Sequence, residues 1–142
     1  MIYSEMVKKA SQIAFDAHRD DFDKGGYPYV MHPLYLAFQM EDEDSVCVAL
    51  LHDVIEDHGD KYSFDYLEKQ GFNERVIEAL KLLTHKKDIS YMEYIEKIKS
   101  DKLATNVKIV DLKHNLDSTR INDCKFYKEG VYKQALSYLE TH

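Results

Sequence analysis

The segment DSVCVALLHDVIED, residues 44–57, most constrains how this chain can fold. Its residues are apolar nearly all the way round when they are placed on a helix, so the segment predicts a helix that is buried on all sides. Glycine and proline number only 5 and 2 among the 142 residues, which favours helices over a turn-rich β fold. The sequence therefore predicts an all-α bundle in which this segment is the central helix.

The rest of the chain divides into short segments with helical spacing, which makes about eight helices in all. The glycine- and proline-containing stretch 20–33 is expected to be a loop, and no linker or repeat interrupts the chain, so residues 1–142 are predicted to form one domain. The other expected helices are one capped by Ser4, one from Pro33 to about Met40, one between Ser63 and Gly71, one from Asn73 to about Leu83, one capped by Ser90, one over about 101–118 and one over about 125–139.

Composition excludes several classes of function. A hydrophobic share of 44% is enough for a packed core, and a net charge of −7 argues against a surface for a nucleic-acid polymer. A small anionic substrate needs only local positive charge and stays possible. No apolar run approaches the roughly 18–20 residues that span a membrane. The two cysteines, Cys47 and Cys124, form no Cys-x-x-Cys pair, and the N-terminus lacks the apolar core of a secretion signal, so a cytoplasmic location is expected.

The end of the central segment carries four ionisable residues where a buried helix should have none. His52, Asp53, Glu56 and Asp57 are three or four residues apart, so they crowd one end of one helix. Three carboxylates close together are costly to bury, and a divalent cation would resolve the conflict. The alternative is a solvated helix end with ordinary acids. The pattern favours the metal site over this alternative.

Two other positions supply matching groups. His32 lies in the expected proline-flanked loop, and Asp111 interrupts the apolar stretch VKIVDLKHN. Taken singly, the first has the alternative of a structural histidine and the second that of an exposed polar stripe. Two histidines and two aspartates form a mixed nitrogen and oxygen set, which suits Mn²⁺, Fe²⁺, Ni²⁺ or Zn²⁺ and is too nitrogen-rich for Ca²⁺ or Mg²⁺.

These residues resemble a known family. His32, then HDVIED at residues 52–57, then Asp111 is similar in order and approximate spacing to the HD superfamily of metal-dependent phosphohydrolases. The blocks AFDAHRDDFDKGGYPYVMHP, ALLHDVIED, LTHKK and VKIVDLKHN resemble the hydrolase domain of RelA/SpoT-type alarmone enzymes and their small stand-alone relatives. The resemblance runs from about Ser4 to Arg120. It implies an HD-type helical bundle that removes the 3′-diphosphate from (p)ppGpp.

The resemblance also implies a role for each matching residue. The metal ligands fall on His32, His52, Asp53 and Asp111, and the usual ion is Mn²⁺. The acid pair that orients and deprotonates the attacking water falls on Glu56 and Asp57. The expected substrate contacts are Lys24, Lys87, Asn115 and Ser118, the last of which is commonly Thr in the family.

Two positions depart from the family pattern. Asp23 and Leu112 stand where the family usually has arginine, and an aspartate cannot stack on a base or grip a phosphate as an arginine does. Three hypotheses follow: a (p)ppGpp hydrolase, an HD hydrolase directed to another substrate such as NADPH or a nucleoside monophosphate, and a nucleotide-binding regulatory module with weak catalysis. The sequence leaves the oligomeric state and the choice among the four metals open.

Overall fold

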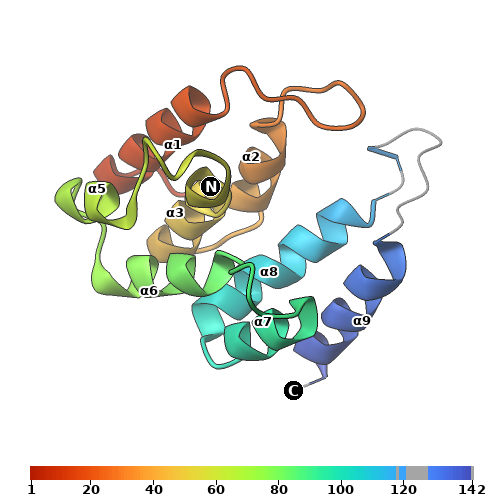
Figure 1. Cartoon of the computed structure of the whole chain (residues 1–142). Coiled ribbons are helices and arrows are strands. Elements are labelled where there is room, and N and C mark those ends of the chain that lie inside the picture. Colours follow the sequence, from red (N-terminus) through yellow and green to blue (C-terminus); the bar gives the residue numbers. More distant parts are fainter. Residues whose placement is uncertain (118, 121–127, 142) are drawn as a thin grey trace.

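The computed structural model describes residues 1–117, 119–120 and 128–141. Regular structure in these residues is helical, as the sequence predicted, apart from an isolated bridge between Phe22 and Pro28. None of the helices in this part of the chain is long and apolar enough to cross a membrane. Figure 1 shows the helices α1 (Glu5–Ala17), α2 (Met31–Phe38), α3 (Glu43–Leu51), α4 (Val54–His58), α5 (Phe64–Lys69), α6 (Glu74–Leu83), α7 (Tyr91–Ile98), α8 (Lys102–Asn115) and α9 (Glu129–Glu140).

Side-chain caps explain where most of these helices begin. A cap accepts a hydrogen bond from a backbone N–H of the first turn, which has no partner within the helix. The predicted caps Ser4, Ser63, Asn73 and Ser90 are confirmed, because each accepts such a bond at the start of α1, α5, α6 and α7. Gly71 follows α5 with φ at +98°, a left-handed conformation that glycine adopts without strain.

Helix α3 is the centre of the molecule, as the sequence predicted. All residues from Ser45 to Leu51 are buried, and α3 packs against α1, α2, α6 and α8 (Figure 1). The prediction of one helix through residue 57 is wrong, however, because α3 ends at Leu51 and α4 begins at Val54. His52 Nδ1 bonds to the carbonyl oxygen of Ala49, the acceptor that residue 53 would use in a continuous helix. The histidine and aspartate of the HD pair therefore lie in a turn.

The second helix begins earlier than expected. Helix α2 starts at Met31, so His32 lies in its first turn and the prediction that it is in a loop is wrong. Pro33 is the third residue of the helix, where a missing N–H breaks no helical hydrogen bond. Near the C-terminus, α8 ends at Asn115 rather than near residue 118. Helix α9 begins at Glu129, and residues 125–127 of the expected last helix lie outside the described part of the chain.

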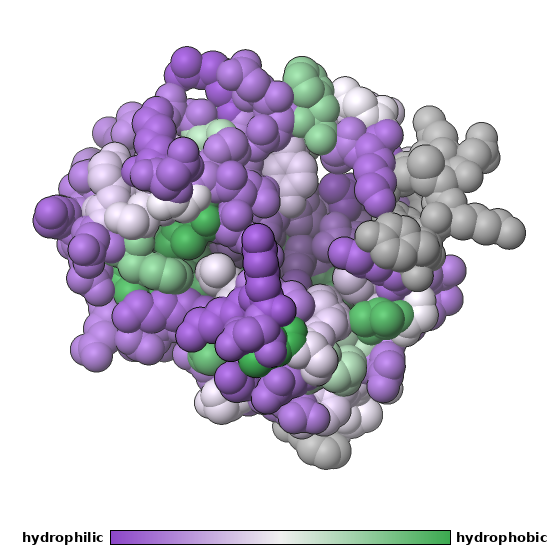
Figure 2. Space-filling model, in the orientation of Figure 1, coloured by the Kyte–Doolittle hydropathy of each residue, from purple (hydrophilic) through white to green (hydrophobic). Residues whose placement is uncertain are grey.

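The face drawn in Figure 2 is mainly hydrophilic, and it is hollowed near its centre. Several large apolar side chains are exposed, among them Phe22 and Met31, which are 65% and 53% exposed. The segment that carries them leads from α1 into α2 and contributes to the site described next.

Candidate metal centre

Four side chains predicted as metal ligands lie together where α2, the turn between α3 and α4, and α8 meet. His32 Nε2 lies 2.8 Å from Asp111 Oδ1, and His52 Nε2 lies 2.9 Å from Asp53 Oδ2. Between these pairs, His52 Nε2 is 3.5 Å from Asp111 Oδ1 and His32 Nε2 is 3.9 Å from Asp53 Oδ2. Three of the four are buried, and the Asp53 side chain is 19% exposed. The cluster is therefore reached from solvent on the side of Asp53.

The second nitrogen of each histidine is held by a neighbour, which directs Nε2 to the centre. His52 Nδ1 donates to the Ala49 carbonyl oxygen at 2.7 Å, and His32 Nδ1 lies 2.7 Å from Nδ1 of His114. Burial, followed by the charge of Arg120, lowers the pKa of His114 to about 4, so this ring is neutral at pH 7. Such partners commonly orient histidines that bind metals. Among the described residues, the buried His52 Nε2 has the Asp53 carboxylate as an ion-pair neighbour at 2.9 Å but makes no hydrogen bond, which fits a role as a metal ligand.

Neighbouring positive groups keep the two carboxylates of the cluster ionised. Burial by itself raises the pKa of Asp53, but the neighbouring His52 outweighs it and holds that pKa below the usual range. Burial opposes ionisation of Asp111 in the same way, and Lys108 with the two imidazoles holds the pKa of Asp111 well below its usual range. The two carboxylates in turn raise the pKa of His52 despite its burial. A divalent ion would supply this positive charge, and two nitrogen and two oxygen donors fit a first-row transition metal.

A pocket of about 790 Å³ opens beside the cluster and carries the predicted acid pair. Glu56 and Asp57, from α4, lie on its wall. Burial by the surrounding protein and then the Asp53 carboxylate raise the pKa of both acids above their usual values. A carboxylate with a raised pKa is a better proton acceptor near neutral pH. The remaining wall is formed by Lys24, Tyr29, Asp53, His85, Tyr91, Tyr94, Lys108, Asp111, Asn115, Lys128, Val131 and Tyr132.

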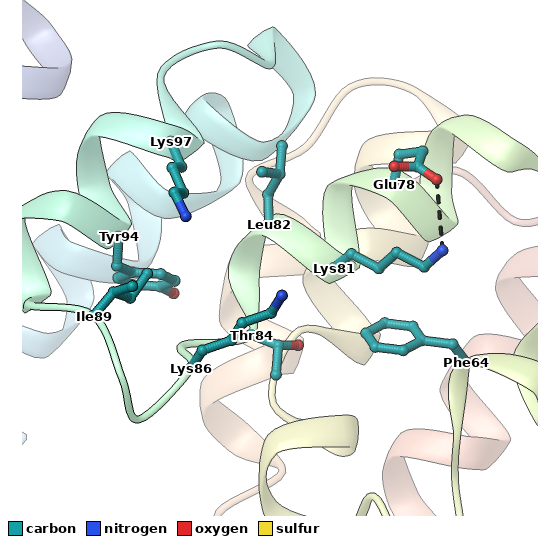
Figure 3. Close-up of a pocket in the computed structure, with 9 residues that line it drawn as sticks. All are labelled: Phe64, Glu78, Lys81, Leu82, Thr84, Lys86, Ile89, Tyr94 and Lys97. Atoms are coloured by element: carbon teal, nitrogen blue, oxygen red, sulfur yellow. Dashed lines mark ion pairs between the residues drawn. The ribbon is translucent and has the colours of Figure 1, made fainter.

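A second pocket, of about 320 Å³, lies at the segment between α6 and α7 (Figure 3). Lys81, Lys86 and Lys97 stand around it, and Lys81 pairs with Glu78 at 3.6 Å. Tyr94 lines both pockets. The smaller pocket has one acid and no histidine in its wall, so the candidate metal centre belongs to the larger pocket.

Comparisons with known proteins show which proteins this chain resembles. No family model matches the chain. A guanosine-3′,5′-bis(diphosphate) 3′-pyrophosphohydrolase of Aquifex aeolicus is 30% identical over 127 residues, which are 83% of this chain and 18% of that protein. A protein of the same name from Haemophilus influenzae is 47% identical over 49 residues, 32% of this chain and 7% of that protein. The similarity to the Aquifex protein covers most of this chain and supports an HD-type ppGpp hydrolase domain.

The fold of this HD domain agrees with a solved relative. The structure of a metazoan ortholog of SpoT that hydrolyses ppGpp matches it with a TM-score of 0.79 at 24% identity, over 98% of this chain and 87% of that chain. The predicted HD-type helical bundle is thereby confirmed. The chain spans less than a fifth of the length of the curated relatives that it matches.

Of the four predicted substrate contacts, two line the larger pocket. Lys24 and Asn115 lie in the wall of the larger pocket. Asn115 also donates from Nδ2 to Asp111 Oδ1 at 3.2 Å, so it holds a candidate metal ligand in place. Lys87 is exposed on the segment between α6 and α7 and lines neither pocket. Ser118 lies outside the described residues.

The two departures from the family pattern have structural roles here. Asp23 Oδ1 accepts hydrogen bonds from the backbone N–H groups of Gly25 and Tyr27, both at 2.9 Å, so this side chain closes the loop. Leu112 is fully buried and contributes no charge to the pocket. Arg120 lies 3.8 Å from Asp23 and donates to Asn115 Oδ1 at 3.2 Å. The HD domain therefore places an arginine near this loop from a different part of the chain.

Sequence reasoning missed several residues of the centre. The Lys108 side chain is 12% exposed, and its Nζ donates to Asp111 Oδ2 at 2.8 Å. The hydroxyl of Tyr29 donates to Asp53 Oδ2, and His114 stacks on His32 with 5.0 Å between ring centroids. A lysine three residues before Asp111 on an apolar helix was the available signal for the first. No local sequence pattern links Tyr29 to Asp53 or His114 to His32, because the members of each pair are far apart in the sequence.

Proposed function

We propose that this HD domain is a metal-dependent phosphohydrolase that removes the 3′-diphosphate from (p)ppGpp, with His32, His52, Asp53 and Asp111 as ligands of one divalent ion. The observation that carries the proposal is the convergence of these four donors from three parts of the fold. Two of them, Asp53 and Asp111, lie in the wall of a pocket that also holds Glu56 and Asp57. The names of the Aquifex and Haemophilus relatives support the substrate. Manganese is the proposed ion and the cytoplasm the proposed compartment.

When bound, the ion would polarise a phosphoryl oxygen and make water a stronger acid. The protein's own side chains would supply the proton acceptor, the positive charge that attracts the substrate and an apolar wall for the nucleoside. One of the two acids Glu56 and Asp57 would accept the proton of the attacking water, which suits acids whose pKa burial has raised. Lys24 and Lys128 add positive charge at the pocket wall, which attracts a diphosphate despite the net charge of −7. The rings of Tyr91 and Tyr132, with centroids 5.9 Å apart, provide an apolar side for a nucleoside.

The first experiment measures pyrophosphate and phosphate release from ppGpp, GDP, NADPH and nucleoside monophosphates, with Mn²⁺ and with chelator. Mn²⁺-dependent release of pyrophosphate from ppGpp supports the proposal. Asp53→Ala should abolish turnover and metal binding at the four-ligand centre, whereas Glu56→Ala should keep the ion at that centre and lose roughly 10²–10⁴-fold in rate. Glu96→Ala, at an exposed position of α7 outside both pockets, is the matched control and should keep wild-type turnover. Normal hydrolysis by the Asp53 and Glu56 variants would overturn the assignment.

A second candidate function is hydrolysis of a different nucleotide or phosphoester. The specific observation behind it is that Asp23 and Leu112 present no cation to the pocket at the two positions where the family usually has arginine. Release from NADPH or a nucleoside monophosphate without release from ppGpp would support this candidate. Nucleotide binding without any release would instead favour a regulatory module.

A further inference from the structure

We propose that His18, Asp21 and His58 bind a second divalent transition-metal ion, at a site distinct from the four-ligand centre and independent of the proposed catalytic function. One ligand atom of each of these three residues lies within 4.8 Å of the others. None of the three belongs to the ligand set inferred from the family resemblance. The inference therefore concerns a cluster that the proposed reaction does not use.

The three donor atoms face one another closely. His18 Nδ1 lies 3.0 Å from Asp21 Oδ2, and His58 Nε2 lies 2.6 Å from the same oxygen. Ligands bonded to a tetrahedral ion at about 2.0–2.2 Å stand about 3.3–3.6 Å from one another, so the side chains need to separate by at most about 1 Å. Two imidazole nitrogens and a carboxylate oxygen suit Zn²⁺, Co²⁺, Fe²⁺ or Mn²⁺.

The backbone holds these ligands in place before any ion arrives. His18 directly follows Ala17, the last residue of α1, and its backbone N–H donates to the carbonyl oxygen of Ala14. The N–H of Asp21 donates to the His18 carbonyl oxygen at 3.1 Å, and the Asp21 carbonyl oxygen accepts from Tyr29 N–H at 2.8 Å. His58 is the last residue of α4. An ion here would join the end of α1 to the end of α4.

The exposure of the cluster suits a site with open coordination positions. The His18 side chain is fully buried, whereas the side chains of Asp21 and His58 are 33% and 31% exposed. Solvent can therefore reach the carboxylate and one imidazole, and water can complete the coordination. His18 Nε2 is buried without a hydrogen-bond partner among the described residues, so Nδ1 is the nitrogen through which this ring reaches the cluster.

The site adjoins the proposed catalytic helix. His58 follows Asp57 in the chain, and the charges of all three cluster residues act on Asp57. A bound ion would fix the C-terminal end of a helix of only five residues that carries Glu56 and Asp57. Occupancy would therefore restrain the acid pair without contacting the substrate.

The test counts the ions bound by the full chain. Purified apoprotein is dialysed against Zn²⁺ and, separately, Co²⁺, and the bound metal is measured by mass spectrometry together with the visible absorption of the Co²⁺ form. Wild type should bind two ions, and His58→Gln and Asp21→Asn should each bind one. Asp53→Ala, which removes a ligand of the other centre, should also bind one, and its Co²⁺ spectrum should be that of the His18, Asp21 and His58 site. The double variant of Asp53 and His58 should bind none.

The controls separate this proposal from the proposed function and from misfolding. Asp20→Asn, an exposed neighbour of Asp21, should keep both ions. His58→Gln changes a partly exposed side chain, and its helical circular dichroism in chelator should equal that of wild type. A single ion in wild type that His58→Gln leaves in place would overturn the second site while leaving the four-ligand centre standing. If Asp53→Ala loses a bound ion but His58→Gln and Asp21→Asn do not, the second site would likewise be overturned.

Discussion

Lys108 shows how much of the metal centre depends on one residue outside the ligand set. Its ammonium group bonds to Asp111 Oδ2 while His32 faces Oδ1 of the same carboxylate. The ammonium also lies over the rings of Tyr94 and Tyr91, 5.3 and 5.9 Å from their centroids. Asp111 and the aromatic rings raise the pKa of Lys108 well above its usual value even though burial opposes the charge. Lys108 is therefore a fixed positive charge that compensates Asp111.

Replacing Lys108 with methionine should destabilise the protein most when no ion is present. Removal of one partner of a buried ion pair costs about 3–5 kcal/mol, because the other charge stays buried without compensation. A divalent ion at the four-ligand centre would supply part of the missing charge, so the loss should be smaller in excess Mn²⁺. Urea denaturation of wild type and variant, in chelator and in Mn²⁺, measures the loss in free energy of unfolding without and with the ion.

Lys99→Met is the matched control for this prediction. Lys99 Nζ donates to the carbonyl oxygen of Tyr138 at 2.7 Å and lies over the ring of the same residue, and no acid among the described residues pairs with it. Its loss should have the same effect on the free energy of unfolding with and without Mn²⁺. An equal Mn²⁺ response of the two variants would contradict the role given to Lys108.

At the scale of helices, the sequence predicted most of the elements because their signals are local. The caps Ser4, Ser63, Asn73 and Ser90 lie next to apolar positions at helical spacing, and each accepts the expected backbone hydrogen bond. The break between α3 and α4 was missed because residues 44–57 read as a continuous apolar helix. Its cause, the bond from His52 to the Ala49 carbonyl oxygen, is a choice of side-chain conformation that the pattern of residue types does not show.

The Asn73 cap gives a prediction at this scale. Asn73 Oδ1 accepts from the Val76 N–H at 3.0 Å, and its Nδ2 donates to Asp44 Oδ1 of α3 at 2.9 Å. Asn73→Ala should lower the free energy of unfolding by about 1 kcal/mol, and the melting temperature by about 3–5 °C. Asn73→Ser should recover most of the loss, because serine also caps a helix. Calorimetry of wild type, Asn73→Ala and Asn73→Ser measures the three melting temperatures. An Asn73→Ala variant that melts at the same temperature as wild type would show that the cap is dispensable.

At the scale of the whole molecule, the packing around α3 determines which groups meet solvent. Cys47 lies on this helix at 1% exposure. Burial, followed by the charges of Glu43 and Asp44, raises the pKa of its thiol to about 12. Because the thiolate is the reactive form, the native thiol stays neutral and inert across the physiological range of pH. Cys47 therefore reports on the opening of the core.

Alkylation of Cys47 should follow global unfolding. In a Cys124→Ser variant, iodoacetamide at pH 8 should label Cys47 negligibly without denaturant, and the labelled fraction should rise with urea at the same midpoint as the loss of helical circular dichroism. Raising the pH from 7 to 9 in the absence of urea should leave the folded thiol unlabelled, because both values lie well below its pKa. Rapid labelling of the folded protein would show that α3 opens locally.

The metal centre was predictable from the sequence as a set of residue types, and less so as a network. The four ligand candidates and the acid pair were identified from spacing on one helix and from the family resemblance, and the structure brings them together. Lys108, Tyr29 and His114 act through contacts with residues distant in the chain. Such contacts arise from packing, which a single sequence does not reveal. The Arg120 contact with Asp23 escaped prediction for the same reason.

The bond between His32 and Asp111 joins residues that are 79 positions apart. A contact that closes so long a loop forms late, because the chain must first lose the entropy of bringing its ends together. During synthesis, His32, His52 and Asp53 leave the ribosome well before Asp111. A nascent chain therefore offers an incomplete set of the proposed ligands, and under the proposed function an ion would bind at this centre only after α8 has been made and has packed against α2. Metal loading would then follow synthesis of the chain, and it would depend on the supply of the ion after translation ends.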